Sequence, residues 1–64
     1  MARMMKVYKV GIGEVLNDGE DVPNMDSTRV MATDAEAAIK KARKEMPRRQ
    51  YIESVELISV VDVV

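Results

Sequence analysis

The sequence predicts an α+β fold: a small β-β-α-β domain with a three-stranded, mainly antiparallel sheet and one helix packed on one face. Residues 33–46 have the apolar periodicity of an amphipathic helix, and the segments on both sides of them alternate as strands do. Asn17-Asp18-Gly19 is a strong turn signal between the first two strands. At 64 residues, the chain is expected to form a single domain over residues 1–64.

The first strand is predicted over Met4–Leu16, where apolar residues recur with a period of two on both faces. Gly11 and Gly13 share one of these faces, which indicates a β-bulge or a close approach of the helix backbone. A dinucleotide-binding turn would need a third glycine where Leu16 stands, followed by a helix, and the sequence provides neither.

The polar residues 17–26 are interpreted as a long, exposed and mobile hairpin loop. Their carboxylates do not match the spacing of a calcium-binding loop, so no metal site is expected there. The second strand is then predicted over Ser27–Ala32, leading directly into the helix.

The helix is predicted to begin at Thr33, which forms a capping box with Glu36. Pro47 disfavours the helical conformation of the residue before it, so the helix ends at Met46. The face that packs on the sheet is expected to contain Ala35, Ala38, Ile39, Ala42 and Met46.

The third strand is predicted over Tyr51–Val63, and its last part is apolar on both faces. A strand of this length spans about 43 Å, whereas a helix of about 13 residues spans about 20 Å and covers one face. We therefore expect a homodimer or larger homo-oligomer, formed by edge pairing or by sheet packing; a β-bulge near Ser59, which would reset the alternation, is the competing explanation. The residues predicted to self-associate are Leu57, Ile58, Val60, Val61, Val63 and Val64.

The composition argues against catalysis. The chain has no histidine and no cysteine, so the common nucleophile–base pairs and structural zinc sites cannot be built. We expect no catalytic residue, no metal site and no cofactor. The chain has no apolar run of the roughly 18 residues that a membrane span needs, and its first residues lack a signal-peptide core. The expectation is a soluble cytoplasmic protein that does not contact membranes.

Charge is segregated along the chain although the net charge is −1. A basic cluster on the outer helix face and the following turn is either a solvated surface or a site for an anionic partner, and it consists of Lys40, Lys41, Arg43, Lys44, Arg48 and Arg49. An acidic set is either a solvated turn or a site for a basic partner, and it consists of Asp18, Glu20, Asp21 and Asp26. Because the acidic loop and the basic helix face carry opposite charges, the loop of one chain could also bind the helix of another.

These observations favour a non-enzymatic protein–protein interaction module that self-associates, such as a small viral or accessory protein that inhibits or adapts a larger machine. The alternative is a nucleic-acid- or ribosome-associated protein that uses the basic helix face. With two tyrosines and no other aromatic residue, base-stacking recognition of single strands is not expected. The element order and the helix opening Ala32–Ile39 are similar to those of many short proteins, including small ribosomal and phage-encoded ones. This similarity assigns no functional residue.

Overall fold

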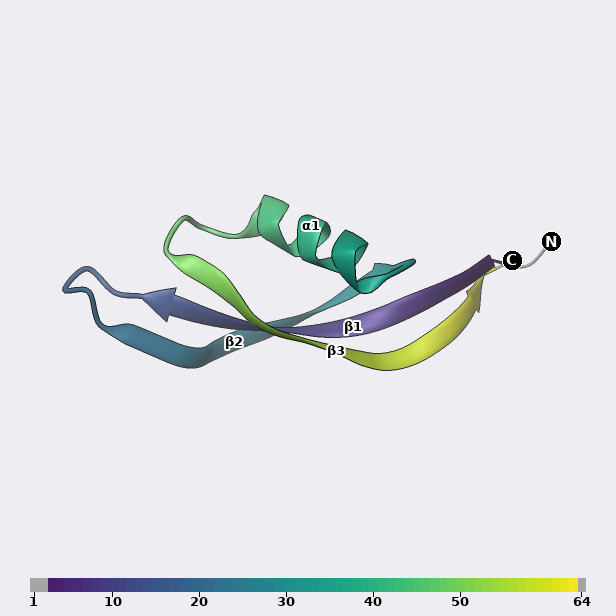
Figure 1. Ribbon diagram of the computed structural model, residues 1–64, viewed down its shortest axis with the longest axis horizontal. Coiled ribbons are helices and arrows are strands. Elements are labelled where there is room, and N and C mark those ends of the chain that lie inside the picture. Colours follow the sequence, from purple (N-terminus) through teal and green to yellow (C-terminus); the bar gives the residue numbers. More distant parts are fainter. Residues whose placement is uncertain (1–2, 64) are drawn as a thin grey trace.

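One helix lies across one face of a three-stranded antiparallel sheet in the computed structural model (Figure 1). The structure describes residues 3–63, and the side chains of residues 4–62. The elements are β1 (Arg3–Val15), β2 (Asp21–Ala32), α1 (Ala35–Glu45) and β3 (Gln50–Val63). The strand order β2-β1-β3 makes β1 the central strand and leaves β2 and β3 as edges. The predicted α+β class and β-β-α-β order are confirmed.

The second strand is twice as long as predicted, so the expected loop over residues 17–26 is wrong. A tight turn at residues 16–20 joins β1 to β2, closed by hydrogen bonds from the Leu16 N–H to the Glu20 carbonyl (2.8 Å) and from the Gly19 N–H to the Leu16 carbonyl (2.9 Å). Gly19 has a φ of +85°, which suits glycine. Pro23 and Asn24 then lie inside β2. An edge strand with a bulge tolerates them, because the ladder with β1 is interrupted there.

The N-cap of the helix lies one residue later than predicted. Asp34 is the N-cap, and its carboxylate accepts a hydrogen bond from the Ala37 N–H at 2.8 Å. The predicted capping box of Thr33 with Glu36 is therefore wrong, since Asp is at least as good an N-cap as Thr and lies next to it. The helix ends at Glu45, and Met46 is extended before Pro47, as the proline predicts.

The core is a thin aliphatic layer between α1 and the sheet. Ala38 packs with Tyr8 and Ala32, and Ala42 packs with Val10 and Ile12. Two small alanines at the contact let the helix axis lie close to the strands. Ala35 is exposed, contrary to the prediction, because starting the helix at this residue places it outside the contact.

The β3 strand contains two extra residues relative to β1. Its pairing steps from Leu57 opposite Tyr8 to Ser59 opposite Val7, so that Ile58 is a bulge, and a second shift leaves Glu53 unpaired. The bulge near Ser59 was the competing explanation for the lost alternation, and it is present. It keeps Leu57 and Val60 on one face of the sheet, although they are three residues apart.

Gly11 and Gly13 lie on the sheet face away from α1, because the alternate residues of β1 pack under the helix. Of the two expectations for these glycines, the approach of the helix backbone is wrong, whereas the β-bulge is confirmed: the register with β2 shifts between Ile12 and Glu14, and the register with β3 shifts between Gly11 and Ile12. The ring of Tyr51 covers Gly13, where a Cβ atom would overlap it. Within residues 3–63, no helix has the length and apolar content of a membrane span.

Candidate interaction surface

The two ends of the chain form a ribbon of two strands that α1 and β2 do not reach. The last residue of β2, Ala32, pairs with Lys6, whereas β1 and β3 continue to the pair Arg3–Val63. We call this ribbon, residues 3–6 of β1 with residues 60–63 of β3, the two-stranded end (Figure 1). The molecule is 51 Å long, but the 11-residue helix covers only about 17 Å of it.

Large apolar side chains are exposed at the two-stranded end and beside it. The exposed fractions are 58% for Met4, 51% for Leu57, 43% for Ile58 and 48% for Val60. Val61 is half-buried. Val64 lies outside the described residues, and so does the side chain of Val63. Within the single chain, the predicted burial of this strand on both faces is thus not met.

Sequence reasoning placed this surface on β3 alone and missed the contribution of β1. Met4 pairs with Asp62, and Lys6 pairs with Val60, so both strands supply the exposed residues. The signal was available, because two antiparallel strands of 13 and 14 residues must bring their far ends together. Met31, at the end of β2, is also exposed, but it pairs with Val7 and therefore lies on the other face of the sheet from Met4 and Val60.

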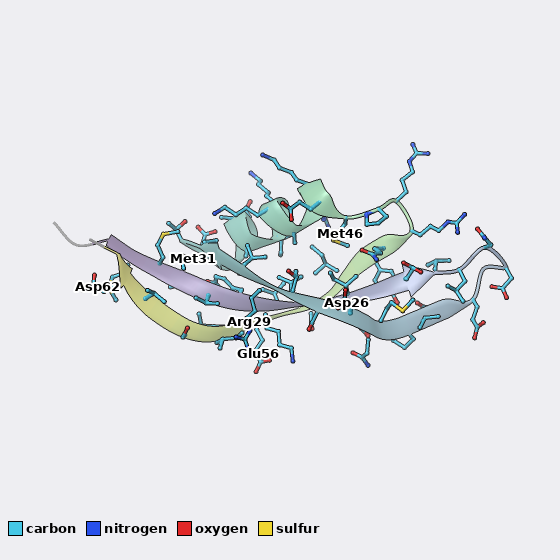
Figure 2. All side chains as sticks on the ribbon, turned by 180° about the vertical axis from the view of Figure 1, so that it is seen from behind. Asp26, Arg29, Met31, Met46, Glu56 and Asp62 are labelled. Carbon is cyan, nitrogen blue, oxygen red and sulfur yellow. The ribbon has the colours of Figure 1, made fainter. Side chains whose placement is uncertain are left out.

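The predicted basic cluster is exposed in all six positions. Figure 2 shows long nitrogen-tipped side chains that project from α1 and the following loop away from the sheet. Lys41 differs, because its ammonium donates a hydrogen bond to the Met31 carbonyl at 2.7 Å and so ties α1 to β2. Arg49 lies beside the end of β1, where its carbonyl accepts from the Val15 N–H at 2.9 Å. The basic turn and the acidic hairpin therefore occupy the same end of the molecule, opposite the two-stranded end.

The predicted acidic residues are exposed but are not gathered into one site. Asp18 accepts from the Glu20 N–H at 2.9 Å and stabilises the turn. Asp26 accepts from the Ser27 N–H at 2.7 Å. Asp21 accepts a hydrogen bond from the Tyr51 hydroxyl. These local hydrogen bonds give three of the four acidic residues a structural role that requires no binding partner.

Side chains from β3 cross the sheet face away from α1 and reach β2 over the two glycines of β1. Besides the Tyr51 hydrogen bond, the Glu53 carboxylate accepts from the Asn24 N–H at 2.8 Å. The hydrogen bond to Asp21, followed by desolvation and by the charges of Asp21 and Glu53, raises the pKa of Tyr51 to about 12. These contacts stabilise the region where both edge strands are bulged.

A groove of 490 Å³ lies between α1 and β2. Its buried or half-buried walls include Ile12, Val30, Ala42 and Met46, and the exposed Lys44 lies at its rim. Figure 2 places Met46 on the helix side of the sheet, opposite Arg29 and Glu56 on the other side.

Comparison with known proteins adds no functional evidence. No family model, no curated protein and no solved structure matches the chain.

Proposed function

We propose that this protein is a non-enzymatic protein–protein interaction module that self-associates through its two-stranded end. The observation that supports the proposal is the exposure of Met4 and Val60 on the two-stranded end, which α1 does not reach, and of Leu57 and Ile58 beside it. Contiguous exposed apolar side chains are typical of interaction surfaces.

The thin core gives a physical reason for association. The buried apolar residues of the core are few, and Val10 is the largest side chain that is fully buried. A domain of this size buries only about 60% of its unfolded surface. A partner over the two-stranded end would add apolar burial that the single chain cannot supply, and the net charge of −1 opposes self-contact only weakly.

A stable interface buries about 800 Å² on each partner, which is a considerable share of the 4910 Å² surface of this chain. A protein that uses so much of its surface for contact suits a role as an accessory protein of the cytoplasm that inhibits or adapts a larger machine. A phage-encoded protein is one example of this class.

Sedimentation velocity between about 1 and 100 µM tests the proposal by measuring the mass in solution. We expect a dimer or larger assembly, and we expect Val60→Asp to dissociate it because the carboxylate would be desolvated at the contact. Met25→Asp is the matched control, since Met25 is also an exposed apolar residue but lies at the hairpin end. A wild-type protein that stays monomeric throughout this range contradicts the proposal.

A second set of substitutions separates the proposal from nucleic-acid binding. Reversing the charge of Lys40, Lys41 and Lys44 together should leave the assembly intact. If the wild-type protein retained RNA in a salt-dependent way and the triple variant lost it, the basic helix face would be the functional surface instead.

A further inference from the structure

The two edges of the sheet differ in their ability to accept another strand. On β2, Pro23 has no N–H to donate, and Asn24 has a φ of 56°, which interrupts the extended backbone. The Met31 carbonyl of the same edge is occupied by the Lys41 ammonium. Natural edge strands are protected from unwanted pairing by such features. The β2 edge is therefore interrupted near both of its ends.

The β3 edge is open by the same criteria. Residues 57–61 contain no proline and no charged residue, and within residues 3–63 no strand lies on the outer side of β3. The Ile58 bulge bends the strand, but Ser59–Val63 remains regular and pairs residue by residue with Arg3–Val7. This regular segment leaves backbone N–H and C=O groups on its outer side for another strand.

The faces of the sheet are poorer sites for a second copy. On the face away from α1, Lys9 lies between Arg29 on β2 and Glu56 on β3, and all three are exposed. Packing another sheet there would remove these charges from water, which is unfavourable for every ion that is left unpaired. On the opposite face, α1 protrudes from the sheet over Tyr8 and Val10, so a second sheet could pack only on the short two-stranded end.

We infer that the occupant of the β3 edge is the Ser59–Val63 segment of a second copy, paired antiparallel about a twofold axis near Val61. This inference rests on the proposed self-association and specifies its geometry. The axis places Asp62 opposite Val60 of the second copy, so that two carboxylates do not face each other. The product is one continuous six-stranded sheet with the order β2-β1-β3-β3-β1-β2, in which both helices lie on the same face.

Hydrogen exchange of the β3 amides, measured by NMR at concentrations above and below the association midpoint, tests the pairing. The outward amides of residues 59–63 should exchange about tenfold or more slowly in the assembly than in the diluted monomer. The outer amides of β2 should exchange alike in both, which is the internal control. Dilution of the wild-type protein gives the monomer reference without a substitution.

Cysteine substitution gives a second measurement, because the chain has no natural cysteine. Opposed residues of paired strands have Cβ atoms about 5 Å apart, so Val61→Cys should form a disulfide-linked dimer rapidly on mild oxidation. Ser27→Cys, on the β2 edge, should link slowly.

An assembly of dimer mass whose β3 amides exchange as in the monomer would overturn edge pairing and leave self-association intact. Protection of the β2 amides instead would overturn the choice of edge. A monomer at every concentration would overturn both proposals.

Discussion

Val60→Ala should weaken the proposed dimer by about 15-fold. The substitution removes two carbon atoms, worth about 1.6 kcal/mol when fully buried. Val60 lies in the paired segment opposite Asp62 of the second copy and is 48% exposed in the single chain, so about half of this energy, roughly 0.8 kcal/mol, remains for a partner that covers it. A symmetric dimer contains two copies of the residue, which doubles the effect to about 1.6 kcal/mol and gives the 15-fold change in Kd.

The measurement is the Kd from sedimentation velocity, with urea unfolding of each variant as a check on its stability. The other half of the burial energy belongs to the fold, so Val60→Ala should also cost the monomer about 1 kcal/mol of its roughly 3–10 kcal/mol. Met25→Ala, at the opposite end of the molecule, should leave the Kd unchanged. The reasoning is refuted if the dimer persists and Val60→Ala keeps its Kd within about twofold of the wild-type value.

Three further predictions concern the fold. The pKa of Tyr51 is about 12 in the folded protein and 10.0 in the unfolded chain, so its hydrogen bond to Asp21 should stabilise the fold fully below pH 10 and lose this effect between pH 10 and 12. Asp21→Asn should lower the folded pKa, measured by ultraviolet titration with Tyr51→Phe as the reference that lacks this ring. An unchanged pKa would exclude the hydrogen bond as the cause of the raised value. Gly13→Ala should destabilise the protein by about 1–3 kcal/mol because the new Cβ atom overlaps the ring of Tyr51. Gly11→Ala should cost less than about 1 kcal/mol, because its new Cβ atom meets the hydroxyl of Ser54, which can rotate away. Equal losses of unfolding free energy for the two variants in urea would contradict this prediction. Asp34→Ala should cost about 1 kcal/mol by removing the N-cap, and a thermal unfolding midpoint equal to that of the wild type would argue against this cap.

The element order was predictable because the hairpin turn and the end of the helix carry strong local signals. Gly19 favours the hairpin turn, and Pro47 ends the helix. The start of β2 was missed because Pro23 and Asn24 disfavour a strand interior, and their tolerance depends on the strand lying at an edge. That position follows from the strand order, which is a tertiary property that local patterns do not encode.

The candidate surface was predictable only in part. The third strand has apolar residues over a greater length than one helix can cover. This observation identified the β3 side of the two-stranded end. The register was not predictable, because the lost alternation allows a bulge near Ser59 without fixing which residue bulges, and a shift of one residue moves every following side chain to the other face. The contribution of Met4 depends on that register and on the point where β2 stops.

The two tyrosines lie on opposite sides of the central strand, Tyr8 under the helix and Tyr51 over Gly13. The chain has no tryptophan, so its near-ultraviolet signal comes from these two rings alone. Replacing either ring with phenylalanine leaves a single optical reporter for one layer of the molecule. Detachment of the helix and loosening of the bare sheet surface can then be followed separately during unfolding, without any added label.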